Sequence, residues 1–131
     1  MGNSIPVEFL DLFKKRAFGH LATIMPDGSP QVSPLWVDFD GKYLILNSEA
    51  GRQKDLNMRR DKRVAVEVQD PENPYRYLLI RGNVVEITEE GADEGIDQLA
   101  IKYTGEKYKY KNPNSPRLIY KILPIHVGTS R

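Results

Sequence analysis

Two cations stand where an apolar run gives way to a segment of helix-forming composition. Arg52 and Lys54 fall in the expected first turn of that helix, shortly after Ser48. The N-terminus of a helix carries a partial positive charge, which disfavours cations and favours an anion. Free backbone N–H groups, a hydroxyl and two cations together form a cradle for a phosphate, each charge-assisted hydrogen bond contributing about 1.5–3 kcal/mol. The same spacing also fits a solvated helix face on which Asp55 neutralises a neighbouring cation.

A second stretch with possible binding chemistry is a strand bracketed by Pro30 and Pro34. Proline donates no hydrogen bond to a neighbouring strand, so this pattern favours the edge of a sheet. The free backbone groups near Gln31 and Ser33 would then suit the polar edge of a planar heterocycle. An ordinary protected edge strand gives the same pattern. Trp36 either stacks on such a ring or on a partner subunit, or packs in the core.

The sequence shows no further catalytic or metal-binding pattern. The only two histidines, His20 and His126, stand far apart, and there is no cysteine. These residues offer no Ser-His-Asp arrangement, no histidine-carboxylate cluster and no thiolate site. We therefore predict no metal site, assign structural roles to both histidines, and leave the catalytic residues unassigned.

Length and composition predict one ordinary globular domain over residues 1–131. With 19 Lys and Arg against 18 Asp and Glu, the net charge of +1 gives no global reason to expect a polyanionic partner. No run approaches the roughly 18 apolar residues of a membrane span, and residues 1–13 lack the apolar stretch of a signal peptide. Because the chain also has no cysteine, we expect a reducing, cytoplasmic location.

Hydrophobic periodicity and turn signals predict the elements that must position these residues. Strands are expected over residues 18–24, 31–39, 43–47, 63–69, 75–87 and 117–127, with a break at 70–74. Helices are expected over residues 5–15, 51–60 and 89–103. Leu56 should face the core, and Gly82 should form a bulge or bend. The close spacing of strands and Gly-bearing turns predicts a mainly β (α+β) fold, an antiparallel six-stranded barrel with flanking helices.

Three short motifs, taken in order and spacing, resemble a known superfamily. They are Gly-His-Leu-Ala-Thr at residues 19–23, Asp-Gly-Ser-Pro-Gln-Val-Ser-Pro at 27–34, and Gly-Arg-Gln-Lys-Asp-Leu at 51–56, continuing to residues 60–61. The chain resembles the pyridoxamine 5'-phosphate oxidase-like superfamily, and within it the small F420-dependent oxidoreductases. The resemblance covers nearly the whole chain. It implies a split β-barrel of the FMN-binding type.

The resemblance also implies where a coenzyme binds. It predicts a homodimer with two coenzyme sites in grooves at the subunit interface, to which residues 75–81 of the second subunit would contribute. Arg52 and Lys54 would hold the coenzyme phosphate, the residues at 31–33 would line the ring, and those at 47–48 would lie between them. The full set of cofactor-binding residues is Gln31, Val32, Ser33, Asn47, Ser48, Arg52 and Lys54.

The function implied by the resemblance is hydride transfer between coenzyme F420 and a small unsaturated organic substrate. FMN is the alternative coenzyme, since both carry a tricyclic ring and a ribityl phosphate. The chain lacks a substrate-binding tail after residues 125–128, which speaks against pyridoxamine-phosphate oxidation. The anionic tail of F420 would be attracted by Arg59, Arg60 and Lys62. Cations at the end of a helix also simply complement its dipole.

Two other classes of function remain open. A nucleic-acid-binding barrel is suggested by interleaved aromatic and basic side chains, namely Tyr103, Lys107, Tyr108, Lys109, Tyr110 and Lys111. The near-zero net charge disfavours it, and the same segment fits a solvated loop or a lid over the coenzyme groove. A coenzyme carrier or sensor without turnover is the other alternative.

Overall fold

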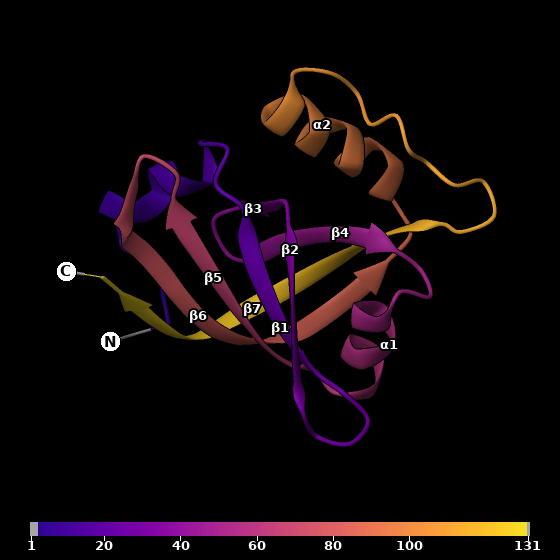
Figure 1. The fold of residues 1–131 in the computed structure, drawn as a ribbon, viewed down its shortest axis with the longest axis horizontal. Coiled ribbons are helices and arrows are strands. Elements are labelled where there is room, and N and C mark those ends of the chain that lie inside the picture. The colour runs from indigo at the N-terminus through magenta and orange to yellow at the C-terminus, as the bar shows by residue number, and fades with distance from the viewer. Residues whose placement is uncertain (1–2, 131) are drawn as a thin grey trace.

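The computed structural model describes residues 3–130, and its main feature is one antiparallel sheet of seven strands in the order β2-β1-β5-β6-β7-β4-β3. The strands are β1 (Gly19–Ile24), β2 (Pro30–Leu35), β3 (Val37–Phe39), β4 (Leu44–Glu49), β5 (Arg63–Asp70), β6 (Asn73–Thr88) and β7 (Arg117–Thr129). The flanking helices are the 3-10 helix η1 (Val7–Phe13), α1 (Gln53–Arg60) and α2 (Ala92–Thr104). Figure 1 shows α1 and α2 toward one end of the molecule and both chain termini at the other.

The sheet is rolled up because its two outermost strands follow one another in the sequence. Only Trp36 separates β2 from β3, yet these strands stand at opposite edges of the sheet. The start of β1 also approaches β3, since a Cβ on Gly19 would lie 3.2 Å from the Cβ of Val37. The two edges come together here, which confirms the predicted split β-barrel.

The core lies inside this rolled sheet. Burial alternates along β5, so that Val64, Val66 and Val68 point inward. Tyr120 and Ile122 of β7 are fully buried in the same core. Burial of each large apolar side chain stabilises the fold by about 1.5–3 kcal/mol. Helix η1 closes one end of the barrel with buried Phe9, Leu12 and Phe13.

Gly82 is the bend in β6 that the sequence predicts. The pairing of β6 with β7 shifts register between Arg81 and Gly82. A Cβ on Gly82 would lie 2.4 Å from the backbone oxygen of Leu123. The residue must be glycine because the two backbones approach too closely for any side chain.

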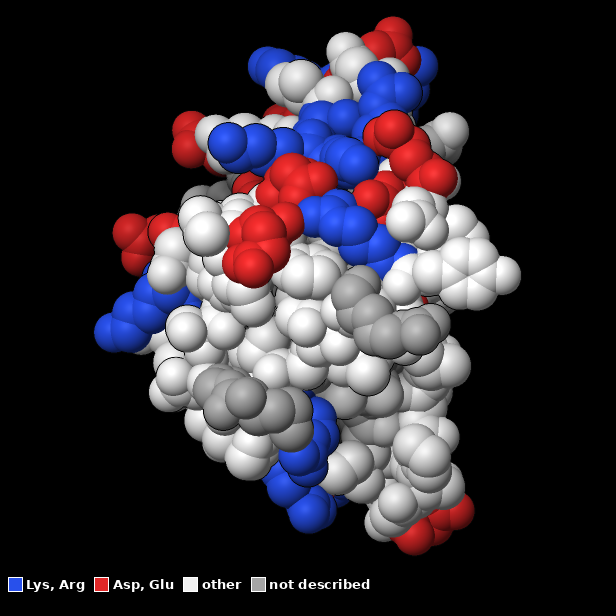
Figure 2. Space-filling view, turned by 90° about the vertical axis from the view of Figure 1, so that its left-hand side faces the viewer, with Lys and Arg blue, Asp and Glu red and all other residues white. Residues whose placement is uncertain are grey.

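Ion pairs tie η1 to the hairpin between β5 and β6. Arg76 lies 2.6 Å from Asp11 and 2.9 Å from Asp70, and Lys15 lies 3.2 Å from Asp70. Figure 2 views the end of the molecule that carries the termini, and it shows charged side chains gathered along one side with a broad uncharged area beside them. The charges on this face are therefore unevenly distributed.

The expected strand over residues 31–39 is two strands, because the chain leaves one edge of the sheet at Trp36 and joins the other. This division raises the strand count from the predicted six to seven. The expected first helix is a shorter 3-10 helix, a form typical of short pieces. The break at residues 70–74 is a tight hairpin turn, since β6 already begins at Asn73.

The prediction that Leu56 faces the core is wrong. Its side chain is 48% exposed, whereas Asp55, Asn57 and Met58 are buried. Helix α1 turns this mixed face inward because Asn57 donates a hydrogen bond to Thr23 of β1 over 3.0 Å. The helix is therefore anchored by polar contacts that hydrophobic periodicity does not reveal.

Within residues 3–130, no helix combines the length and the apolar character needed to span a membrane.

Candidate functional site

A cleft of about 230 Å³ opens where the end of β4, the start of α1 and the start of β7 meet. Apolar and aromatic groups form one part of its wall, and polar and cationic groups form the other. The lining residues are Phe18, Pro34, Leu35, Trp36, Asn47, Ser48, Arg52, Lys54, Ile96, Tyr108 and Arg117. Four of the seven predicted coenzyme-binding residues therefore lie together, namely Asn47, Ser48, Arg52 and Lys54.

Three cations converge on this cleft. Burial lowers the pKa of the Lys54 ammonium, and the charges of Arg52 and Arg117 lower it further. The side chain of Arg52 is 59% exposed and lies 3.7 Å from Glu49. The three positive charges in one cleft repel one another, and a bound anion would offset this repulsion.

Arg117 is the most buried of the three cations, with 8% of its surface exposed. Its Nε donates a 2.9 Å hydrogen bond to the Asn47 side-chain oxygen, and its guanidinium lies 5.0 Å from the centre of the Tyr108 ring. Within residues 3–130 it forms no ion pair. A buried cation without a counter-ion is costly, and a bound anion would offset that cost.

Asn47 positions Arg117 and links it to α2. Its side-chain nitrogen donates a 2.9 Å hydrogen bond to the backbone oxygen of Ala92, in the first turn of α2. The opposite end of the same amide accepts the bond from Arg117. This predicted residue is buried, and its amide bonds both Arg117 and α2.

Asp55 fixes the turn that carries Arg52. Its buried carboxylate accepts hydrogen bonds from the Gly51 backbone N–H at 2.9 Å, the Tyr120 hydroxyl at 2.7 Å and Arg59 Nε at 3.0 Å. Gly51 has a φ of +89°, a left-handed conformation that glycine adopts without strain. The first turn of α1 is therefore held to β7 by side-chain contacts.

The three predicted ring-lining residues of β2 lie outside the lining of this cleft, which takes Pro34 and Leu35 instead. Gln31 accepts 3.4 Å hydrogen bonds from Thr23 and Asn57, and Val32 is 66% exposed. The hydroxyl of Ser33 is buried, and no group within residues 3–130 forms a hydrogen bond with it. β2 is an edge strand, as the flanking prolines predict.

Trp36 is half-buried at the mouth of the cleft and stands against aromatic neighbours. Its ring is stacked on Tyr103 with 5.3 Å between centroids, and it meets the edge of Tyr108 at 6.1 Å. The Tyr103 hydroxyl donates a 2.6 Å hydrogen bond to the backbone oxygen of Ala17. Trp36 is therefore a fixed wall of the cleft and not a core residue.

The segment rich in lysine and tyrosine after α2 is held close to that helix. Asp97 accepts a 3.1 Å hydrogen bond from the Tyr108 backbone N–H and lies 3.0 Å from Lys111 Nζ. These two contacts bring Tyr108 under Arg117 and into the wall of the cleft.

The three cations predicted to attract the anionic tail of F420 lie outside the cleft. Arg59 pairs with Asp55 at 3.0 Å, and Arg60 donates hydrogen bonds to the Ile24 backbone oxygen and to Asn57. Lys62 is exposed and does not line the cleft. Arg59 and Arg60 are engaged within the fold, as cations that anchor a helix often are.

Sequence reasoning missed Arg117, and it gave the segment of Tyr108 a place at the coenzyme groove only as one alternative, a lid. Arg117 follows a polar loop and begins β7, and the pairing of β7 with β4, in which Arg117 lies opposite Glu49, brings it to the cleft. Its position directly after Pro116 gives no signal of burial. The basic residues around Tyr108 give no indication of its aromatic contact with Trp36.

The residues present fit a phosphate-bearing coenzyme. Three cations and the Ser48 hydroxyl supply charge-assisted donors, and Trp36, Tyr108 and Phe18 supply aromatic surface. Within residues 3–130, no three histidine or carboxylate side chains are placed to hold a metal ion. The donor set therefore suits an organic anion.

The rolled antiparallel sheet and its flanking helices define a split β-barrel protein. The chain belongs to the pyridoxamine 5'-phosphate oxidase family, whose sequence profile matches residues 5–130. This is a family of flavin-type oxidoreductases. The match confirms the family and the fold that the three sequence motifs predict.

Solved structures support the same assignment. The chain is 34% identical to an F420 reductase, with a TM-score of 0.85 and coverage of 95% of this chain and 98% of that one. It is 26% identical to a conserved hypothetical protein from Mycobacterium tuberculosis, with a TM-score of 0.74 and coverage of 99% and 88%. HupZ from Group A Streptococcus, at 22% identity, a TM-score of 0.71 and coverage of 95% and 93%, shows the fold alone.

Proposed function

We propose that this chain is an F420-dependent oxidoreductase that transfers a hydride between the coenzyme and a small unsaturated organic substrate. The observation that carries the proposal is the buried Arg117, which forms no ion pair within residues 3–130 and lies beside Lys54 and Arg52 in a cleft with aromatic walls. The 34% identity to an F420 reductase over almost the whole chain supports this coenzyme.

In this proposal the coenzyme phosphate binds in the cleft lined by Arg52, Lys54 and Arg117, which we call the cation cleft. Arg117 provides a buried charge and Lys54 a half-buried one. Arg52 closes the site from the solvent side, and the Ser48 hydroxyl donates a further hydrogen bond. Asn47 acts through Arg117 as a positioning residue. Gln31, Val32 and Ser33 line the ring further along β2. When bound, the reduced coenzyme supplies a hydride, and the substrate takes up that hydride with a proton from water.

We also propose a homodimer, because one chain supplies only part of a coenzyme site. The cleft of about 230 Å³ is smaller than a typical cofactor pocket of roughly 300–1,000 Å³. Val32, Leu79 and Phe18 are large apolar side chains that are 48–66% exposed, and burial against a second copy would remove them from water. Sedimentation equilibrium tests this directly, since a monomer at the concentration used for coenzyme binding would contradict it.

The test of the function is a fluorescence titration of the purified protein with F420 and, separately, with FMN. We expect saturable binding that Arg52→Ala/Lys54→Ala weakens at least about 10-fold, the equivalent of one charge-assisted hydrogen bond. Lys14→Ala/Lys42→Ala is the matched control, because both lysines are exposed and neither lines the cleft. Tighter binding of FMN would make FMN the coenzyme, and equal loss in both double variants would contradict the site.

Reduced coenzyme mixed with candidate substrates then separates an enzyme from a carrier. Substrate-dependent oxidation of bound F420 supports turnover. Tight coenzyme binding with no oxidation by any unsaturated substrate would favour a carrier or sensor instead.

A further inference from the structure

His20 on β1 and Glu67 on β5 form a pair on the outer face of the barrel. The two residues lie opposite one another in the register, and 2.8 Å separates His20 Nδ1 from a carboxylate oxygen of Glu67. A carboxylate accepts hydrogen bonds, so Nδ1 is the donor and Glu67 fixes the orientation of the imidazole. Within residues 3–130, the second ring nitrogen, Nε2, has no hydrogen-bond partner. The His20 side chain is 42% exposed, so its ring is accessible to a small molecule.

The outer face of the sheet beside this pair is apolar. Val32 of β2, Ala22 of β1 and Ala65 of β5 lie opposite one another in the register, so their side chains share that face. Val32 is 66% exposed, and its two partners are small. This row of side chains, directly next to His20 along β1, offers a floor on which a planar ring can lie.

A coenzyme ring along residues 31–33 of β2, as proposed above, would lie on this outer face. The inner face of β2 is occupied, because Gln31 accepts a hydrogen bond from Asn57 of α1 and the Ser33 hydroxyl is buried. Val32 points to the opposite side, where it is exposed. The ring would therefore rest on Val32, on the side from which His20 projects.

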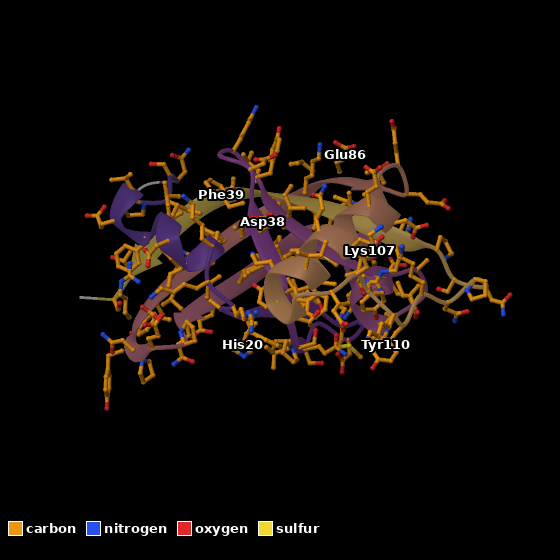
Figure 3. The ribbon with its side chains drawn as sticks, turned by 90° about the horizontal axis from the view of Figure 1, so that it is seen from above. His20, Asp38, Phe39, Glu86, Lys107 and Tyr110 are labelled. Atoms are coloured by element: carbon orange, nitrogen blue, oxygen red, sulfur yellow. The ribbon has the colours of Figure 1, made fainter. Side chains whose placement is uncertain are left out.

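His20 is close enough to reach a molecule on that ring. His20 and Val32 are diagonal neighbours across the β1-β2 pair, and such neighbours stand about 7–8 Å apart, within reach of an aromatic side chain. Pro34, which lies directly opposite His20, also lines the cation cleft. Figure 3 shows His20 at the outside of the barrel. A coenzyme with its phosphate in the cleft and its ring over Val32 would therefore pass beside the imidazole.

The two strands next to the ring offer a single proton donor. Over residues 19–24 and 30–35, which form β1 and β2, His20 is the only titratable side chain. An imidazole changes its protonation state near neutral pH, so it can give up a proton and regain it. Sequence reasoning treated His20 and His126 alike, but His126 stands on β7, which three strands separate from β2.

We infer that His20, oriented by Glu67, donates the proton that accompanies hydride transfer. The inference rests on the proposed function, because it assigns a residue to the same reaction. When one carbon of a conjugated double bond takes up a hydride, the displaced π electrons must take up a proton elsewhere in the substrate. The N–H bond at Nε2 breaks, a C–H bond forms, and the neutral imidazole regains a proton from water. The same electron pair reduces the substrate and oxidises the coenzyme. Glu67 is a positioning residue, whose charge also stabilises the protonated imidazole.

Diethyl pyrocarbonate, which acylates accessible imidazole nitrogens, tests the position of His20 without turnover. The purified protein is treated with and without saturating F420 or FMN, and the modified histidines are identified by peptide mass spectrometry. Bound coenzyme should slow the modification of His20 several-fold and leave exposed His126, the internal control, unchanged. Equal rates of His20 modification with and without bound coenzyme would overturn the inference.

Single-turnover oxidation of the bound, reduced coenzyme by 2-cyclohexen-1-one, trans-2-hexenal or maleimide tests the chemical role. His20→Gln should lower the rate constant by about 100- to 10,000-fold, while the dissociation constant of the coenzyme changes little. Imidazole added to His20→Ala should restore part of the rate, which a purely structural contact between β1 and β5 would not allow. Glu67→Gln should also lower the rate constant, but added imidazole should not restore it, because His20 still occupies the site. The matched control is His126→Gln, which should react as the unmodified protein does.

A rate constant for His20→Gln equal to that of the unmodified protein would overturn the inference. Equal losses of rate and of coenzyme affinity would overturn it as well, because His20 would then hold the coenzyme. Both results leave the proposed function in place, since the unmodified protein still oxidises the coenzyme with a substrate. If no coenzyme binds, or if none of the three alkenes oxidises the bound coenzyme, the proposed function fails and the role of His20 fails with it.

Discussion

The hydroxyl of Tyr120 donates a 2.7 Å hydrogen bond to the carboxylate of Asp55, and both residues are buried. This contact joins β7, the strand that begins with Arg117, to α1, the helix that begins beside Arg52. Burial raises the pKa of the Tyr120 hydroxyl, so the hydroxyl keeps its proton at neutral pH. The hydrogen bond between the two elements that supply the cations therefore persists at neutral pH.

Replacement of Tyr120 by phenylalanine should lower the free energy of unfolding by about 1–3 kcal/mol, because Asp55 loses one of its buried donors. The carboxylate keeps its bonds from Gly51 and Arg59, so the fold should survive. Urea unfolding measures the change. The control is Tyr75→Phe at an 82% exposed tyrosine, which should be within about 0.5 kcal/mol of the unmodified protein. Equal stability of both variants would contradict the role of the contact.

Arg117 should contribute more to coenzyme binding than Arg52, although only Arg52 was predicted from the sequence. Arg117→Gln should weaken F420 or FMN binding by roughly 10- to 150-fold, as for a buried charge-assisted hydrogen bond. Arg52→Gln should weaken it by about 2- to 5-fold, because that side chain is 59% exposed and screened. Isothermal titration calorimetry of each variant gives both ratios.

Riboflavin, which lacks the phosphate, is the matched ligand for this comparison. Its affinity should change little in either arginine variant if both side chains act on the phosphate. An equal loss of FMN and riboflavin affinity in Arg117→Gln would show instead that the variant disturbs the cleft as a whole.

Lys54 should give coenzyme binding an alkaline pH dependence. Burial, Arg52 and Arg117 lower its pKa below the usual 10.5. A bound phosphate favours the charged ammonium, so the affinity for the coenzyme should be greatest below the lowered pKa and should fall as the pH rises through it.

The same lowered pKa affects folding. The unfolded chain binds more protons between that pKa and 10.5, so the free energy of unfolding of the coenzyme-free protein should rise with pH in this window.

The measurement is the FMN dissociation constant against pH on the alkaline side of neutrality, for the unmodified protein and for Lys54→Gln. The variant should bind more weakly at neutral pH and show a flatter profile. Coincident slopes for the two proteins would mean that Lys54 does not contact the phosphate.

The sequence could predict the hairpins β1-β2 and β3-β4, because alternating patterns flank the glycine-bearing turns at Gly28 and Gly41. It could also predict Arg52 and Lys54, since both belong to one strand-to-helix junction. Arg117 enters the same cleft from a strand that only pairing with β4 brings into contact, and pairing across the sheet leaves no mark in local periodicity. Strand order decides which residues meet, and strand order was not available from the pattern.

Helix α1 shows the same limit on a smaller scale and allows a direct test. Its inward face carries Asp55, Asn57 and Met58, so the apolar Leu56 faces solvent. Leu56→Gln should change stability by less than about 0.5 kcal/mol, whereas Met58→Ala should cost about 2–5 kcal/mol through the cavity it leaves. Urea unfolding of the two variants checks this. A larger loss of unfolding free energy in Leu56→Gln would mean that Leu56 is buried, as expected from the sequence. If a second subunit buries it, the loss should shrink when the sample is diluted.

The close approach of β6 to β7 at Gly82 predicts that this position tolerates no side chain. An alanine Cβ there would lie 2.4 Å from the Leu123 backbone oxygen and 3.0 Å from Ile122, so one of the two strands must shift. Overpacking of this kind costs about 1–3 kcal/mol, and more where the obstacle is backbone.

Gly128→Ala is the matched control in the neighbouring strand, because its nearest neighbours would be 3.9 Å away. We expect Gly82→Ala to unfold at clearly lower urea concentration than Gly128→Ala. Because β7 begins with Arg117, a shift of that strand should also weaken FMN binding. Equal unfolding midpoints for the two variants would show that the strands separate easily at Gly82, and the bend would then not be needed to hold β7 in place.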